Sequence, residues 1–221
     1  MTATTTRRTA LAATALAVAA PLRAQAPVRP AGWRAAFDAA GQPDSALAFA
    51  AMPPGWHLTA PAVGGVVWDP AHVVGATTKV ESELFLFAGA PETGTGLLVG
   101  GQALGEAGAR WTAFVVGPDG RYRVLRRDGT AVRELVPWTA HPAITPRPAD
   151  RPNVRLLLGV EGAGETVRFL VNGARVAELP RATVQPEGVV GFRLERGANT
   201  HVSTLRLDGR NVAPEPTKPA H

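Results

Sequence analysis

The sequence predicts an all-β protein, built as a sandwich or a barrel. Residues 77–87 alternate, with Val80, Ser82, Leu84 and Leu86 on one side of a strand and Lys79, Glu81, Glu83 and Phe85 on the other. Turn signals rich in Gly, Pro, Asn and Asp recur every 8–12 residues or so, which is the spacing of sandwiches and barrels. After residue 46 the sequence has no helical period of useful length. About ten to twelve strands are therefore expected.

Two hairpins have the clearest turn signals. Residues 111–116 and 121–127 flank a Pro-Asp-Gly turn at residues 118–120, where Pro presets φ and Gly accepts a positive φ. The apolar residues 169–171 precede Asn172-Gly173, which is typical of a two-residue type I′ turn. Both segments are expected to be antiparallel hairpins, and Asn172-Gly173 is expected to have a structural role only.

Residues 1–26 have the layout of a secretory signal peptide. Arg7 and Arg8 precede an apolar run over residues 10–22, and Ala24-Gln25-Ala26 follows as a small-x-small cleavage signal. The run is too short to span a bilayer. We expect an exported protein, periplasmic or extracellular, that begins at Pro27. The arginine pair leaves both the general secretory and the twin-arginine routes open.

The remainder of the chain divides into three parts. Residues 27–46 form a Pro/Ala-rich lead-in, in which residues 35–40 are either a short helix or an irregular strand. Residues 47–208 form the β-sandwich domain, and residues 209–221 form a Pro-rich flexible tail. After the signal, no apolar segment approaches 18 residues, so no transmembrane segment is expected.

The composition excludes several chemistries. The chain has no Cys, which excludes disulfides, thiolate nucleophiles and Cys-based metal sites. Removing the signal takes away Arg7, Arg8 and Arg23 and no acid, which lowers the net charge by three from +5 to +2. No Lys/Arg cluster alternates with aromatic residues, so nucleic acid is not an expected partner. The histidines are isolated and no phosphate-binding loop opens a helix, so no metal and no cofactor are expected.

Several strand and turn segments resemble the concanavalin A-like lectin/glucanase superfamily. They are residues 96–99, 111–114, 119–124, 137–139, 142–144, 169–173 and 188–192, together with Asn153, Val202 and Leu205. Within that superfamily the chain is most similar to 3-keto-disaccharide hydrolase-like domains and their laminin-G-like relatives. The resemblance covers about residues 47–208. It implies a two-sheet jelly-roll β-sandwich whose concave face binds a carbohydrate.

Glu81 and Glu83 are the candidate catalytic residues. In a strand, residues i and i+2 share a face with Cα atoms roughly 6.5–7 Å apart. Two carboxylates at such a separation can divide the roles of acid and nucleophile or base in glycoside hydrolysis. The retaining jelly-roll glucanases place an Asp between two Glu residues at wider spacing, whereas Ser82 stands here. The alternative is an exposed strand face on which Lys79 lies beside Glu81.

Five residues are candidates for glycan binding: Trp111, Tyr122, Trp138, Arg121 and Arg123. A sugar stacks its apolar face on an aromatic ring, while its hydroxyls bond to nearby polar groups. A guanidinium also suits the carboxylate or sulfate of an acidic glycan. Each Trp can instead belong to the core, and the arginines can form a solvated face that blocks edge pairing. Trp138 follows Pro137 in a loop-like run, which favours a place at the rim.

Three functions remain open. The favoured one is an exported glycan-binding protein. The alternatives are a glycoside hydrolase of the 3-keto-disaccharide hydrolase type and a structural or interaction module of the cell envelope. Acidic residues with raised pKa values in one pocket would favour the enzyme. Aromatic residues along a shallow groove would favour the lectin, and a flat apolar face would favour the interaction module.

Overall fold

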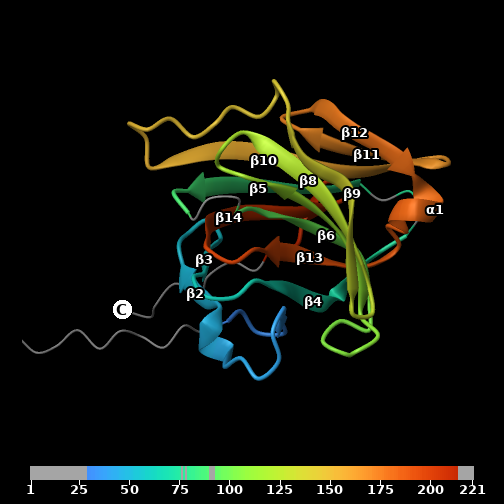
Figure 1. Cartoon of the computed structure of the whole chain (residues 1–221), viewed down its shortest axis with the longest axis horizontal. Coiled ribbons are helices and arrows are strands. Elements are labelled where there is room, and N and C mark those ends of the chain that lie inside the picture. The colour runs from blue at the N-terminus through green and yellow to red at the C-terminus, as the bar shows by residue number, and fades with distance from the viewer. Residues whose placement is uncertain (1–28, 76, 78, 90–92, 214–221) are drawn as a thin grey trace, which may run out of the picture.

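The described residues form two antiparallel sheets (Figure 1). The computed structural model describes residues 29–213 except 76, 78 and 90–92. The predicted signal peptide, residues 1–26, lies outside the described residues, as do residues 214–221 of the predicted tail. The prediction of an all-β, two-sheet sandwich is confirmed.

The seven-stranded sheet has the order β1-β4-β13-β6-β7-β8-β9. Its strands are β1 (Arg34–Phe37), β4 (Gly65–Val74), β13 (Gly188–Leu194), β6 (Thr95–Gln102), β7 (Arg110–Val116), β8 (Arg121–Asp128) and β9 (Ala131–Ala140). Strands β6 to β9 are neighbours in the sheet in the order of the chain, but β13 is inserted between β4 and β6. The centre of the sheet therefore depends on pairing between residues far apart in the sequence.

The eight-stranded sheet has the order β12-β11-β10-β5-β14-β3-β2, and β15 pairs with β14. Its strands are β2 (Ala48–Ala51), β3 (Trp56–Ala60), β5 (Lys79–Phe87), β10 (Asn153–Ala163), β11 (Thr166–Val171), β12 (Ala174–Pro180), β14 (Ala198–Leu207) and β15 (Arg210–Asn211). The helical segments of the described chain are η1 (Asp44–Ala46) and α1 (Arg181–Val184), and α1 lies at one end of the sandwich (Figure 1).

The expected lead-in is part of the sandwich. Of the two alternatives for this segment, a strand is correct: β1 pairs with β4, and Trp33 just before it stacks on Phe192 with ring centroids 6.0 Å apart. The sandwich thus begins before residue 47. Four residues are too few to show a period, and pairing with β4 makes them a strand. The described start of the expected tail is corrected likewise, because β15 (Arg210–Asn211) pairs with β14 and the Asn211 Oδ1 accepts a hydrogen bond from the Leu205 N–H.

Aromatic rings from both sheets meet in the core between the inner faces. Phe114 of β7 lies 5.2 Å from Phe169 of β11 between ring centroids, and both side chains are fully buried. The alternation in β5 is as predicted, since Val80, Ser82 and the residues that follow on that side are buried. The Ser82 hydroxyl donates to the Thr204 carbonyl at 2.6 Å, so this polar group is satisfied inside the sandwich.

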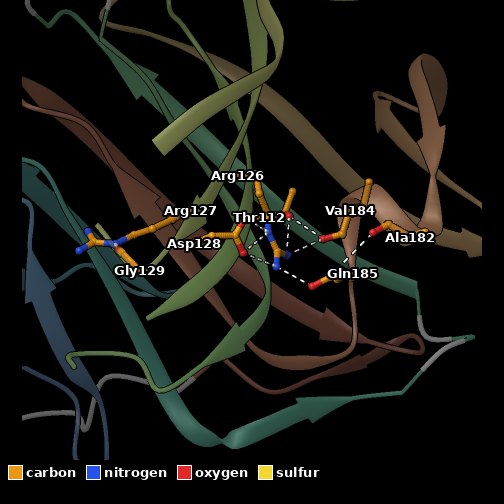
Figure 2. Close-up of polar contacts among 8 residues, drawn as sticks. All are labelled: Thr112, Arg126, Arg127, Asp128, Gly129, Ala182, Val184 and Gln185. Atoms are coloured by element: carbon orange, nitrogen blue, oxygen red, sulfur yellow. Dashed lines mark hydrogen bonds and ion pairs between the residues drawn. The ribbon is translucent and has the colours of Figure 1, made fainter. Parts of the chain in front are cut away.

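A buried arginine links β8 to the end of α1 (Figure 2). Arg126 of β8 is only 2% exposed and points to the inner face, beside Thr112. Its guanidinium donates to the Val184 carbonyl at 3.0 Å, to the Gln185 Oε1 at 2.6 Å and to the Asp128 carboxylate. These bonds satisfy a charge that would be costly to bury alone, and they tie β8 to the end of α1.

Both predicted hairpins are present. The strands β7 and β8 pair in continuous register from Arg110 opposite Asp128 to Val116 opposite Tyr122. Asn172 and Gly173 join β11 to β12 with φ values of 52° and 81°, the signs that a type I′ turn requires. The Asn172 Oδ1 also accepts a hydrogen bond from the Leu157 N–H at 3.0 Å.

Gly173→Val is expected to lower the free energy of unfolding by about 1–3 kcal/mol, because a β-branched residue is strained at positive φ. A Cβ at Gly173 would meet no heavy atom within 4 Å, so a clash of the Cβ does not contribute to this loss. Urea denaturation measures it. Gly108→Val is the matched control, since Gly108 is equally open and its φ is not positive. Equal stability of the two variants would contradict strain at this turn.

Candidate functional site

The outer face of the seven-stranded sheet, which points away from the other sheet, holds a second buried cluster. Its apolar members are Val66, Trp68, Leu98, Trp111, Ala113, Val115 and Leu125. They alternate along β4, β6, β7 and β8 with residues of the main core, so this sheet is apolar on both faces. Three arginines and one glutamate accompany them: Arg121, Arg123, Arg193 and Glu195. With Trp68, Trp111 and Trp138, these residues are called here the arginine–tryptophan face.

Arg123 and Glu195 form the central ion pair of this face. Arg123 lies opposite Val115 in the hairpin, and Glu195 directly follows β13. The Glu195 Oε1 accepts hydrogen bonds from the Arg123 Nε at 3.0 Å and from its Nη2. The same guanidinium donates through Nη1 to Glu134 of β9 at 3.0 Å. One arginine thus connects β8, β9 and the end of β13.

Glu195 is a buried carboxyl. Its side chain is 6% exposed, and its Oε2 has no hydrogen-bond partner among the described residues. Burial raises the pKa of Glu195, because removal from water disfavours the charged form. The hydrogen bonds and positive charge of Arg123, and the charge of Arg193, act on this pKa in the opposite direction. Asp38 raises it further by repulsion.

Trp138 of β9 lies beneath two arginines. The Arg123 guanidinium carbon is 4.8 Å from the ring centroid and that of Arg121 is 5.5 Å away, a cation–π arrangement. Gly94 lets the ring approach the sheet, since a Cβ there would lie 3.1 Å from the Trp138 Cη2. The ring is half-buried. Part of its surface therefore remains accessible beside guanidinium donors. The predicted loop-like run is a correction, because Trp138 lies within β9, the edge strand of the sheet.

A second ion pair lies on the β4 side of the face. Both Nη atoms of Arg193 bond to the carboxylate of Asp38, at 2.5 and 2.7 Å. The guanidinium carbon lies 5.6 Å from the centroid of the Trp111 ring, which is only 2% exposed. Beside Trp111 is a pocket of about 70 Å³, and its polar lining includes Asp38, Glu106 and Arg127. Trp111 thus forms the buried floor of the face.

The structure brings three of the five predicted glycan-binding residues together, since Arg121 and Arg123 lie over Trp138. Trp111 is on the same outer face but beside Arg193, and at 2% exposure it belongs to the buried cluster, which is the alternative that the sequence left open. The prediction for Tyr122 is wrong. Its side chain points to the inner face, whereas those of its sequence neighbours Arg121 and Arg123 point outward, and it is only 4% exposed. Its hydroxyl donates to the Val176 carbonyl at 2.7 Å. The alternation of β8 separates it from its neighbours, so Tyr122 belongs to the core.

The candidate catalytic pair lies elsewhere. Glu81 and Glu83 are half-buried on the outer face of the eight-stranded sheet, on the side of β5 opposite its buried residues. Glu81 pairs with the Lys79 ammonium at 2.9 Å, and the Arg155 Nε donates to the Glu83 Oε1 at 2.5 Å. Each carboxylate has its own cation, an arrangement typical of a solvated strand face.

Sequence reasoning missed Asp38, Arg193 and Glu195. Arg193 and Glu195 are two residues apart in an apolar segment, a spacing that places both side chains on one face of a strand. That spacing is the signal that could have found them. Their meeting with Asp38 and Arg123 follows from the position of β13 in the sheet.

The described residues contain no group of three or more His, Asp or Glu side chains that could hold a metal ion. His57 and His201 lie opposite each other on β3 and β14, and the His57 Nε2 is 2.7 Å from the Asn199 Oδ1. Burial lowers the pKa of His201, since it disfavours the charged ring.

Within residues 29–213, apart from the gaps given above, no helix is long and apolar enough to cross a membrane.

Solved structures share this fold. The carbohydrate-binding module CBM66 of Bacillus subtilis is similar to it with a TM-score of 0.57 and 12% identity, over 80% of this chain and 94% of that chain. A family 16 glycoside hydrolase, an endo-glucanase of Bacteroides ovatus, is similar with a TM-score of 0.57 and 7% identity, over 81% of this chain and 96% of that chain. A protein of unknown function with a galectin-like fold, from Bacillus subtilis, is similar with a TM-score of 0.55 and 13% identity, over 79% of this chain and 88% of that chain.

At these identities the likeness establishes the fold alone. No family model matches the chain, and no curated protein matches it. The protein has the concanavalin A-like sandwich fold, which carbohydrate-binding modules and family 16 glucanases share.

Glu195→Gln is expected to change how stability depends on pH. Because the folded protein raises the pKa of Glu195, it binds a proton more tightly than the unfolded chain does. The wild type should therefore lose stability relative to the variant as pH rises from about 4 through the folded pKa. Urea denaturation of both proteins from pH 4 to about 7 measures the difference.

Glu178→Gln is the control of opposite sign. Hydrogen bonds from Thr166 and then Arg175 lower the pKa of Glu178, so here the wild type should gain stability relative to the variant as pH rises through the acidic range. The same trend in both pairs would refute the account given for Glu195.

Proposed function

We propose that the protein binds a glycan on its arginine–tryptophan face. The observation that carries this proposal is the position of Trp138, a half-buried ring beside the guanidinium groups of Arg121 and Arg123. A sugar needs an apolar surface for its ring and charged donors or acceptors for its hydroxyls, and both lie within this face. Carbohydrate binding in the similar module of Bacillus subtilis supports the proposal through the fold.

Hydrolysis of a glycosidic bond is the second candidate, of the 3-keto-disaccharide hydrolase type that the sequence resembles. One observation favours it: Glu195 is a buried carboxyl with a raised pKa, close to Asp38 and Arg123. A proton donor needs such a carboxyl. However, its Oε2 is buried from solvent and Arg123 occupies its Oε1, so a substrate oxygen would have to displace the protein's own groups. Binding without hydrolysis therefore ranks first.

An envelope interaction module ranks third. A docking face would need a contiguous exposed apolar patch. The large apolar side chains exposed among the described residues are Met52, Val73 and Val132, on separate segments of the chain. The apolar cluster of the outer face is itself buried. This arrangement favours a ligand with hydroxyl groups over an apolar protein partner.

Trp138→Ala is expected to weaken glycan binding by about 5- to 30-fold, which corresponds to roughly 1–2 kcal/mol of lost stacking and cation–π support. A glycan array followed by calorimetry with the best ligand measures the effect. The matched control is Trp56→Ala, a half-buried tryptophan on the other sheet, which should leave the affinity unchanged if the variant stays folded. Unchanged affinity in Trp138→Ala would place the binding site elsewhere.

We also propose that the protein acts outside the cytoplasm, as a result of the signal sequence over residues 1–26. Small residues at Ala24 and Ala26 follow the apolar run and favour cleavage after Ala26. N-terminal sequencing of protein from the periplasm or the medium should then begin at Pro27. Recovery of the chain from the cytoplasm with Met1 intact would contradict export.

A further inference from the structure

The arginines of the arginine–tryptophan face are already neutralised by the protein. Arg123 bonds to both Glu195 and Glu134, and Arg193 is held by both oxygens of Asp38. Arg121 bonds through Nε to the Asp119 Oδ2 at 2.7 Å, and its Nη2 lies at the same distance from that oxygen. Each of the three therefore has at least one carboxylate partner.

The carboxylates are built into the face to different depths. The side chain of Glu195 is 94% buried, that of Asp38 is 38% exposed and that of Glu134 is 44% exposed. Glu195 lies beneath Arg123, so a ligand that approaches the guanidinium does not displace it easily. The nearby pocket is lined by two carboxylates, Asp38 and Glu106, and one arginine, Arg127, so its lining has no excess of positive charge.

An acidic glycan would meet this arrangement unfavourably. Its carboxylate or sulfate would have to share Arg123 with two protein carboxylates, or Arg193 with one, and like charges brought close together repel. A neutral sugar meets no such repulsion. Its hydroxyls can donate to carboxylate oxygens and accept from guanidinium N–H groups, and both kinds of partner stand side by side here.

We propose, as a deepening of the glycan-binding function and dependent on it, that the ligand is an uncharged glycan, and that Glu195 and Glu134 exclude acidic glycans by neutralising Arg123. This reverses the expectation that the arginines receive a carboxylate or sulfate. The face selects against charge because its own ion pairs already use the guanidinium groups.

The first test compares ligand classes. The purified protein is applied to an array that carries neutral, uronic-acid-containing and sulfated oligosaccharides at pH 7.5. Binding is expected on neutral glycans, with acidic glycans at least about tenfold weaker. The affinity for the best neutral ligand should change less than about twofold between about 20 and 300 mM sodium chloride, because no net ion pair forms.

The second test releases the guanidinium. Glu134→Gln and Glu195→Gln each remove one countercharge and keep the shape of the side chain, so each should raise the affinity for the best-matched uronic-acid oligosaccharide about 5- to 10-fold at low salt. Glu134 is exposed enough that its variant should fold even if the Glu195 variant does not. Glu178→Gln, which removes one charge from the surface of β12, should not change the affinity for this uronic-acid oligosaccharide.

The outcomes separate the two proposals. Tighter, salt-sensitive binding of acidic glycans by the wild type would overturn the inference and leave glycan binding in place. No gain of acidic-glycan affinity in a folded Glu134→Gln protein would also overturn it. Failure to bind any class on the array would contradict the proposed function itself, and the inference with it.

Discussion

The seven-stranded sheet buries side chains on both of its faces, and this constraint governs the rest of the structure. Its inner face packs against the other sheet, and its outer face is filled by Trp68, Trp111 and their apolar neighbours. A charge placed in such a layer must be paired, because an isolated buried ion costs several kcal/mol. Arg193 and Glu195 are both under 9% exposed, and each is bound to an opposite charge from another segment.

Arg126 is also a buried charge that must be paired, but its partners leave it in a different position. This arginine is on the inner face, where its donors bond to a carbonyl, an amide oxygen and Asp128, all from the protein. It has no surface left for a ligand, and its function is to hold the end of α1 against β8. Arg123 is half-buried and lies over the Trp138 ring. The face of β8 on which each side chain lies thus distinguishes Arg126, which the protein encloses, from Arg123, which keeps solvent-accessible surface.

The fold alone does not choose between binding and hydrolysis. Similar structures include a carbohydrate-binding module and an endo-glucanase, both at TM-scores of 0.57. The choice depends on where carboxylates lie and how free they are. Glu81 and Glu83 each have an exposed cation as partner, and Glu195 is closed in by Arg123. With their carboxylates so occupied, neither group favours catalysis over recognition.

The sequence by itself determined the features that depend on neighbouring residues. Alternation placed the buried side of β5, and the turn residues placed the hairpin that sets Arg123 opposite Val115. Strict alternation in β8 also contained the signal that Tyr122 faces away from Arg121. Only the tertiary structure decided that β13 lies between β4 and β6, and so that Glu195 reaches Arg123 from 72 residues away along the chain. Such pairing depends on which edges remain unpaired once the local hairpins have formed, and a local pattern does not contain that information.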